Sequence, residues 1–400
     1  MSDLTPPDSA HLSPLRSVHT SSFPELLSAL NVSVAVSTYQ ASRLVLLRPA
    51  DGTLNTHFRA FDKPMGVATD RSRIAIGTAM DITEFHNIPA VGARSDPERP
   101  NDACFLPRNS HSTGDIQIHE MEWGTENLAS DGRTLDDEPS VAISGSKTLW
   151  FVNTRFSCLC TRSSEHSFTP RWRPRFISAY TPEDRCHLNG LGMVDGRPKF
   201  ATALGESDEP AGWRKNKRTG GILMDVPSGE IIARGLSMPH SPRWHDEKLW
   251  VLNSGDGGIG IVDESSGRYE QVAKLQGFTR GLSFLGRYAF VGLSQVRESA
   301  IFSGIRIAQR PEEERWSGVA VVDTVAGEVV AWMRFEDQIQ EVFAVSLLPG
   351  MLWPDVVNDD EELISSTWVL PDEALQEVPA SWRAKTGSHS VESSEEQPFK

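Results

Sequence analysis

Short apolar runs separated by turn-forming residues dominate the pattern along the chain. Runs of four to seven residues rich in Val, Leu, Ile and Trp alternate with clusters of Gly, Pro, Asp and Ser, and helical periodicity is nearly absent. Representative runs occupy residues 32–37, 149–153, 249–253 and 318–323. Runs of this length bounded by turn signals predict an all-β protein.

The apolar runs repeat as a two-strand unit. In each unit a five-residue motif is followed by a second apolar strand, and successive motifs begin 38 to 68 residues apart. This spacing is close to one four-stranded blade with its loops. The six motifs occupy residues 63–67, 119–123, 187–191, 240–244, 278–282 and 341–345. They predict a six-bladed β-propeller.

A turn in which Gly follows Asp by four residues marks the outer half of the repeats. It occurs after Asp225, Asp263 and Asp323, where the carboxylate can bond backbone N–H groups and Gly can adopt a positive φ. Two apolar runs, residues 32–37 and 42–47, precede the first motif. We expect these N-terminal strands to complete the last blade, because closing the ring removes a free sheet edge.

Composition divides the 400-residue chain into one domain with two polar ends. Residues 1–25 predict a flexible N-terminal segment, residues 26–370 hold the propeller, and residues 371–400 predict a disordered acidic tail. The length is about twice that of a usual single core, and a repetitive architecture accounts for it.

Charge and cysteine content narrow the functional classes. The chain has 39 Lys and Arg against 54 Asp and Glu, a net charge of −15, which argues against a nucleic-acid or anionic-membrane partner. No apolar run is long enough to span a bilayer, and the start lacks the features of a signal peptide. The 4 cysteines are too few for a disulfide scaffold. These features favour a cytoplasmic protein with a small-molecule or peptide substrate.

Three longer motifs resemble a family of bacterial conserved hypothetical proteins. They occupy residues 183–191, 238–245 and 277–282, and the resemblance extends from about residue 30 to 355. It implies a propeller-like fold and no particular activity. More distantly, the layout is similar to strictosidine-synthase-like and gluconolactonase-like six-bladed propellers. The lactonases hold a divalent cation with carboxylate and Asn side chains, whereas this chain offers histidines, so the resemblance does not transfer a lactonase activity.

Histidines recur at the start of the propeller motifs. Aligned on their final apolar residue, the motifs place three histidines and one carboxylate at an equivalent position around the channel. The six aligned residues are Lys63, His119, His187, His240, Phe278 and Glu341.

Neutral imidazoles offer lone pairs to a transition metal, and three or four protein ligands leave a coordination position open for water or substrate. We therefore expect His119, His187 and His240 to hold a divalent Fe, Zn, Mn or Cu ion, with possible help from Glu341. In the alternative interpretation, the histidines bond backbone carbonyls or water and keep the blades in register.

Polar side chains inside the motifs are candidates for substrate binding. Arg280 and Arg243 could each clamp an anionic group, and either could instead form an inter-blade ion pair. Asn189 could orient substrate or cap the adjacent Gly turn.

Long loops are expected on the histidine face, at residues 78–114, 153–181, 204–219 and 293–316. Their aromatic and basic residues, including Arg155 and Trp213, could form the wall of a pocket. The loops could equally cover the propeller or contact another subunit.

Together these features favour a metal-dependent enzyme that acts on a small organic or peptide-like substrate by hydrolysis or oxidation. Glu341 and Arg280 would be its catalytic residues. One alternative is a non-catalytic propeller that binds a protein or peptide. Another is a metal-free hydrolase or cyclase of the strictosidine-synthase-like kind, in which Glu341 is the acid–base group.

Overall fold

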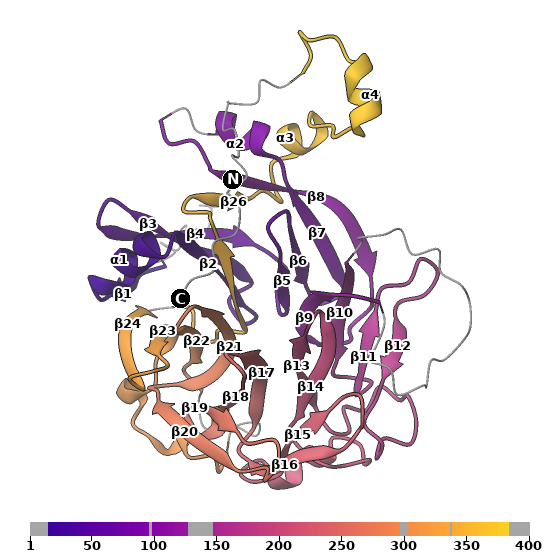
Figure 1. The fold of residues 1–400 in the computed structure, drawn as a ribbon, viewed down its shortest axis with the longest axis vertical. Helices are drawn as coiled ribbons and strands as arrows, with labels where there is room; N and C mark the ends of the chain where they lie inside the picture. The colour runs from indigo at the N-terminus through magenta and orange to yellow at the C-terminus, as the bar shows by residue number, and fades with distance from the viewer. Residues whose placement is uncertain (1–14, 96–97, 127–146, 297–302, 337, 384–400) are drawn as a thin grey trace, which may run out of the picture.

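Six sheets stand around a central channel as the blades of a β-propeller in the computed structural model of the chain (Figure 1). The structure describes residues 15–95, 98–126, 147–296, 303–336 and 338–383. The prediction of an all-β, six-bladed propeller is confirmed.

Each blade runs from an inner strand at the channel to outer strands at the rim. Blade 1 contains β5 (Val67–Thr69), β6 (Arg73–Gly77), β7 (Asp81–Asn87), β8 (Ala103–Ser112) and β26 (Pro354–Val356). Blade 2 contains β9 (Ile118–Gly124), β10 (Thr148–Asn153), β11 (Cys158–Thr161) and β12 (Thr169–Trp172). Blade 3 contains β13 (Leu188–Val194), β14 (Arg197–Ala203), β15 (Gly221–Asp225) and β16 (Ile231–Leu236). Blade 4 contains β17 (Pro239–His245), β18 (Lys248–Asn253), β19 (Gly258–Val262) and β20 (Tyr269–Lys274). Blade 5 contains β21 (Phe278–Leu285), β22 (Tyr288–Ser294), β23 (Ser317–Asp323), β24 (Glu328–Phe335) and β1 (Ser17–His19). Blade 6 contains β25 (Ala344–Pro349), β2 (Val32–Thr38), β3 (Arg43–Ala50) and β4 (Thr53–Ala60).

The two ends of the chain close the ring together. The late strand β25 is the inner strand of blade 6 and pairs antiparallel with β2, so that Val32 lies opposite Pro349 and Ser37 opposite Ala344. The expected closure by N-terminal strands is therefore confirmed, and β4 joins β2 and β3 as a third such strand.

Large aromatic side chains from the second strands fill the layers between blades. Trp150, Phe200, Trp250 and Phe290 are each no more than 2% exposed. Burying a large apolar side chain contributes roughly 1.5 to 3 kcal/mol, so these layers are a main source of stability. Because second strands are covered on both faces, they appear in the sequence as continuous apolar runs.

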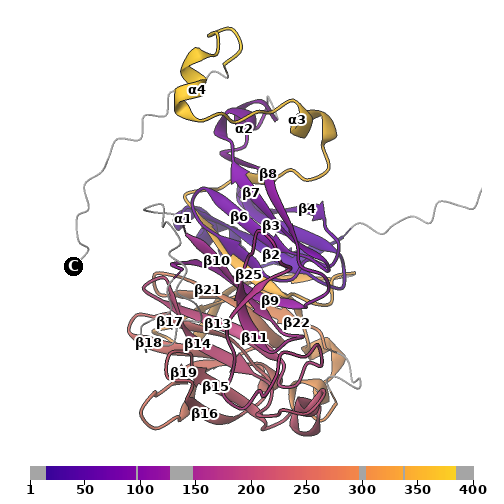
Figure 2. The same ribbon diagram turned by 90° about the vertical axis from the view of Figure 1, so that its right-hand side faces the viewer.

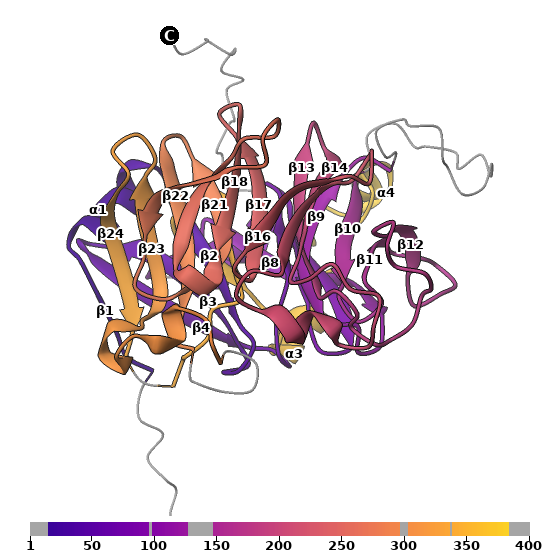
Figure 3. The same ribbon diagram turned by 90° about the horizontal axis from the view of Figure 1, so that it is seen from below.

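In the N-terminal segment, regular structure begins earlier in the chain than the sequence predicted, at Ser17. β1 pairs with β24, and the helix α1 (Ser22–Ala29) buries Phe23 and Leu27 against blades 5 and 6 (Figure 3). Within the predicted flexible segment of residues 1–25, the structure thus has β1 and the start of α1, where Phe23 is buried. Residues 1–14 lie outside the described residues.

The C-terminal segment carries two short helices beyond the propeller. α3 (Glu361–Ser365) and α4 (Asp372–Glu377) lie past the outer strands of blade 1 (Figure 2). α4 lies in the segment predicted to be disordered and has no buried residue, and residues 384–400 lie outside the described part. No helix within the described ranges is both long and apolar enough to cross a membrane.

Two of the four predicted long loops contain strands instead. Residues 78–114 hold β7, β8 and the helix α2 (Pro89–Ser95), and residues 153–181 hold β11 and β12. These outer strands are partly exposed and partly polar, so their apolar signal is weak. Residues 204–219 and the described part of 293–316 are irregular connections, as predicted.

Candidate functional site

Strand register defines which residues are equivalent around the channel. In four successive blades, one inner-strand position pairs with the aromatic residue of the second strand. The pairs are Glu122–Trp150, Gly192–Phe200, Arg243–Trp250 and Ser283–Phe290. Three residues before this position lie the equivalent side chains His119, Asn189, His240 and Arg280.

The predicted alignment of the motifs is therefore wrong by two residues in blades 3 and 5. Asn189, and not His187, corresponds to His119 and His240, and Arg280 takes this position instead of Phe278. A two-residue shift returns each side chain to the same face of its strand, so the apolar pattern does not reveal it.

His119 and His240 are held in the same way. Both are buried, and the Nδ1 of each lies close to the carbonyl oxygen of the residue two positions earlier, at 3.1 Å from Gln117 and 2.9 Å from Met238. Those two residues have left-handed backbones, with φ of 56° and 47°. A carbonyl only accepts, so Nδ1 carries the proton and Nε2 keeps its lone pair.

A hydroxyl group reinforces each of these contacts. Thr154 Oγ1 lies 2.8 Å from Nδ1 of His119, and Ser254 Oγ lies 3.0 Å from Nδ1 of His240. Burial, and after it the charge of Arg280, holds the pKa of both histidines well below the ordinary value of 6.5. Both rings are consequently neutral at neutral pH.

His187 reaches the same region from a different backbone position. It immediately precedes β13, and its Nδ1 lies 3.0 Å from both carboxylate oxygens of Asp184. Its ring centroid is 4.8 Å from that of His119 and 4.5 Å from that of Trp213. Trp213 also donates Nε1–H to Asp184 at 3.0 Å. Asp184 and His187 therefore form a pair, and the indole of Trp213 contacts both side chains and holds them in place.

Asp184 was not predicted as a site residue. Its sequence signal is an acid three residues before His187, and this spacing brings the side chains together only because both residues adopt a left-handed φ, 49° and 52°. Positive φ is uncommon outside glycine, although Asp and His adopt it more readily than most residues, and such conformations often cluster at active sites and ligand-binding positions.

A buried ion pair lies beside the histidines. Arg280 Nη1 is 3.1 Å from Glu341 Oε1, and the guanidinium carbon lies 3.3 Å from the ring centroid of Phe343. The ring of Phe343 is in turn 5.0 Å from that of His119. Phe343 therefore contacts both His119 and the guanidinium, and it is a further residue that the sequence analysis did not select.

Burial changes the acidity of both partners in this ion pair. It lowers the pKa of Arg280 to about 10, partly offset by Glu341 and Glu120, so the guanidinium stays charged at neutral pH. It raises the pKa of Glu341, although the charge of Arg280 opposes the shift. The site thus combines a fixed cation, a carboxyl group that holds its proton more readily than usual, and three imidazoles.

Metal ligation requires a closer arrangement than these side chains adopt. Across the described ranges, no three His, Cys, Asp or Glu side chains lie near enough to one another to hold a metal ion. His119 and His187 are in ring contact, whereas the ring of His240 packs against Phe278, with centroids 5.5 Å apart.

Arg243 links four blades of the propeller. From blade 4, its Nε donates to Leu282 O at 3.0 Å, its Nη1 donates to Leu191 O at 2.9 Å, and its Nη2 lies 3.2 Å from Glu120 Oε1. These contacts match the inter-blade ion pair that was the alternative to substrate binding.

Asn189 also bonds protein groups on both sides. Its Nδ2 donates to Pro239 O at 3.0 Å, and its Oδ1 accepts from Thr202 at 2.7 Å. Arg155 forms an ion pair with Asp115 and reaches the site through its backbone, whose carbonyl accepts the Asp184 N–H at 2.9 Å. Neither side chain reaches the imidazoles through a contact of its own in the described residues.

The two irregular connections cover the channel mouth. Apolar residues from them pack with Met238 and Phe278, which flank His240. The full cluster is Leu204, Trp213, Met238, Phe278, Val296, Ile305, Ile307 and Ala308. This cover leaves His187 and Glu341 as the more accessible groups, with side chains 15% and 27% exposed.

Comparison with known proteins identifies a family without an assigned activity. Residues 21–357 match the family described as Domain of unknown function (DUF4915), which confirms the resemblance to hypothetical proteins seen in the sequence. The comparison with curated proteins found no match.

Solved structures are similar only at low identity. A nidogen/laminin complex has 9% identity and a TM-score of 0.46, covering 80% of this chain and 99% of that chain. A protein of unknown function from Bacteroides caccae has 10% identity and a TM-score of 0.46, covering 79% and 98%. Virginiamycin B lyase from Staphylococcus aureus has 12% identity and a TM-score of 0.36, covering 64% and 71%. At these scores the three likenesses do not bear on function.

Proposed function

The chain belongs to the DUF4915 family, whose function is unknown, and we propose from its site that it is an enzyme. Its reaction would be acid–base chemistry on a small organic or peptide-like substrate at the channel mouth. The observation that carries the proposal is the Asp184–His187 pair, whose imidazole is in ring contact with His119, the histidine that the charge of Arg280 also reaches.

His187 is suited to accept a proton. The carboxylate of Asp184 accepts from Nδ1, which leaves the Nε2 lone pair for a substrate or water. His119 and His240 are buried, whereas part of the His187 side chain is exposed. A substrate would therefore meet His187 first.

Glu341 and Arg280 supply complementary functions. A carboxyl group whose pKa is raised by burial keeps its proton to a higher pH than an exposed one and could donate that proton to a leaving group. When Glu341 is protonated, the charge of Arg280 is no longer neutralised, and it can stabilise negative charge on the substrate. In a hydrolysis, His187 would take the proton of the attacking water and Glu341 would protonate the departing oxygen or nitrogen.

The proposal is tested by turnover of a panel of esters, lactones and short peptides with protein purified without an affinity tag. We expect His187→Gln and Asp184→Asn to reduce kcat by about 10²- to 10⁴-fold, the range for loss of a general base. His166→Gln, a change at an exposed loop histidine, is the matched control and should keep full activity. Unaltered turnover in His187→Gln would contradict the assignment. Peptide binding without turnover of any panel member would favour the non-catalytic alternative.

A second candidate is the metal-dependent enzyme with His119, His187 and His240 as ligands to Fe, Zn, Mn or Cu. It is favoured by one observation: each Nδ1 faces a carbonyl or carboxylate oxygen, as metal-bound histidines usually do in proteins. The three Nε2 atoms would have to converge by side-chain movement.

Metal analysis separates the two candidates. Tag-free protein would be loaded with each of the four ions and measured beside His187→Ala and His240→Ala. One bound ion per chain that both variants lose would support the metal site. Absence of bound ion in the wild type after loading would remove it, while leaving the acid–base proposal standing.

We also propose that the enzyme acts in the reducing cytoplasm. All 4 cysteines are buried and free, and the Sγ atoms of Cys158 and Cys160 lie 3.4 Å apart without a bond. Buried free thiols are usual in cytoplasmic proteins.

A further inference from the structure

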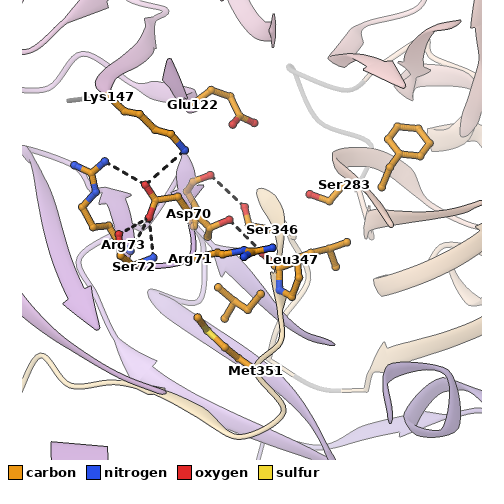
Figure 4. Close-up of a pocket in the computed structure, with 15 residues that line it drawn as sticks. Asp70, Arg71, Ser72, Arg73, Glu122, Lys147, Ser283, Ser346, Leu347 and Met351 are labelled. Carbon is orange, nitrogen blue, oxygen red and sulfur yellow. Dashed lines mark hydrogen bonds and ion pairs between the residues drawn. The ribbon is translucent and has the colours of Figure 1, made fainter. Parts of the chain in front are cut away.

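A cavity of about 720 Å³ opens at the other end of the channel (Figure 4). In β9, His119 lies at the site end of the strand and Glu122, three residues later, lines the cavity. In β21, Arg280 and Ser283 have the same relation. A strand rises about 3.3 Å per residue, so the two sites are roughly 10 Å apart along the inner strands.

One wall of the cavity is apolar and braced. It is formed by residues such as Phe284, Leu347 and Met351. Hydroxyl groups beside it already donate to carbonyls of the adjacent blade, from Ser283 to Val345 O at 2.9 Å and from Ser346 to Val67 O at 3.2 Å. The wall is thus preformed, and its hydroxyl protons are occupied by the protein.

The lining of the cavity also carries charge. Its cations are Arg71, Arg73 and Lys147 and its carboxylates are Asp70 and Glu122, so three positive and two negative groups leave a net charge of +1. Volumes of 300 to 1,000 Å³ with an apolar wall and a few polar groups are typical of sites for small ligands.

Asp70 and Arg73 are already neutralised by contacts within the protein. Asp70 accepts from Ser72 N and Oγ at 2.9 Å, and it pairs with Arg73 at 3.1 Å, with Lys147 4.0 Å away. Arg73 also pairs with Glu84 at 3.3 Å. Figure 4 shows this cluster on one side of the cavity.

Arg71 is the cation of the cavity lining that no neighbouring side chain among the described residues neutralises. Its side chain is exposed at the cavity and makes no ion pair or hydrogen bond with any described residue. The facing acid, Glu122, lies 3.7 Å from Arg243, and burial raises its pKa although that cation opposes the shift. Both features reduce the repulsion that an incoming anion would meet.

We propose that this cavity binds an organic monocarboxylate with an apolar body. The carboxylate would pair with Arg71, assisted by Lys147, and the apolar body would lie against Phe284, Leu347 and Met351. The proposal is independent of the proposed function, because its residues lie at the other end of the channel.

The test is calorimetric titration of the full chain with 3-phenylpropionate, with the neutral 3-phenylpropionamide and the cationic 3-phenylpropylamine as matched probes. We expect the carboxylate to bind and both analogues to bind at least about fivefold more weakly, the size of one accessible ion pair. Labelled Met351 methyl resonances should shift on addition of the carboxylate and report that it occupies this cavity.

Variants at exposed positions make the test specific. Arg71→Glu should weaken 3-phenylpropionate binding by about fivefold or more. Lys248→Glu makes the same charge change at the exposed first residue of β18 in blade 4 and should leave binding unaltered, as should His187→Gln at the other end of the channel. Equal affinity for the three probes, unaltered binding by Arg71→Glu, no shift of Met351, or no binding at millimolar concentration would each overturn the proposal.

Discussion

At the scale of single residues, the site consists of imidazoles whose proton positions are fixed by the backbone. His119 and His240 donate toward carbonyls at matching positions in two blades, and Asp184 serves the same purpose for His187. The nearby cation, Arg280, is buried with them. A buried imidazole beside a fixed positive charge resists protonation, and this has a consequence for stability.

We predict that the two buried histidines make the protein less stable in acid. The pKa of each is lower in the folded chain than the ordinary value of 6.5. Below that value the unfolded chain binds protons that the folded chain does not. The free energy of unfolding therefore decreases as the pH is lowered, by up to about 1.4 kcal/mol per pH unit for each histidine. Above it the effect is absent.

Urea unfolding between pH 5 and 8 measures this slope. In His240→Gln, the dependence of the free energy of unfolding on pH below 6.5 should be smaller by the contribution of about one histidine. His166→Gln should keep the pH dependence of the wild type. Identical slopes for the wild type and His240→Gln would contradict the prediction.

At the scale of elements, the C-terminal segment divides into a packed part and an exposed part. β26 pairs parallel with β8, and Leu363 and Ile364 of α3 pack against a small cluster with Val91 and Leu106. Beyond α3, the chain continues into α4, away from the blades (Figure 2), and apolar side chains of this segment are exposed. The exposed ones are Trp368, Val369, Leu370, Leu375 and Trp382.

We predict that tryptophans in the two environments differ sharply in their contribution to stability. Trp368→Ser, at a side chain 75% exposed, should change the free energy of unfolding by no more than about 0.5 kcal/mol. Trp250→Ser, at a side chain 2% exposed between blades, should lower it by roughly 3 to 5 kcal/mol. Thermal and urea unfolding of both variants measures the difference. A loss of similar size in Trp368→Ser would show that the segment after α3 is packed.

At the scale of the whole molecule, stability depends on the seam where the ring closes. Blade 6 unites strands from the two ends of the chain, so its pairing joins residues that are far apart in the sequence. Ser37 lies at this seam: its hydroxyl donates to Met65 O of blade 1 and accepts from Ala344 N at 3.0 Å. One buried side chain therefore joins both ends of the chain and two blades.

We predict that Ser37→Ala weakens the seam. The Ala344 N–H would lose a buried acceptor, which costs about 1 to 3 kcal/mol. Ser110→Ala, at an exposed position of β8, is the control and should have little effect. Urea unfolding gives the energies, and faster hydrogen exchange at β25 amides in Ser37→Ala would locate the change. Equal stability of the two variants would exclude this role for Ser37.

The sequence by itself determined the blades of this protein. Alternating apolar runs, repeated motifs and Asp–Gly turns are local signals, and they were sufficient to predict six blades and closure by N-terminal strands. Outer strands such as β7 and β8 were mistaken for loops, because a partly polar strand at the rim has little apolar signal. His119 and His240 were aligned as equivalent because both motifs end on a Trp four residues after the His, and the strand register agrees.

Only the tertiary structure decided how the site is assembled. The two-residue offset that separates His187 from Asn189 preserves strand face, so no hydrophobic pattern could expose it. The pairing of Asp184 with His187 depends on two left-handed backbone angles, and the contacts of Phe343 with both His119 and Arg280 depend on how three blades meet at the axis. Packing between distant segments sets these relations, and local residue preferences do not encode them.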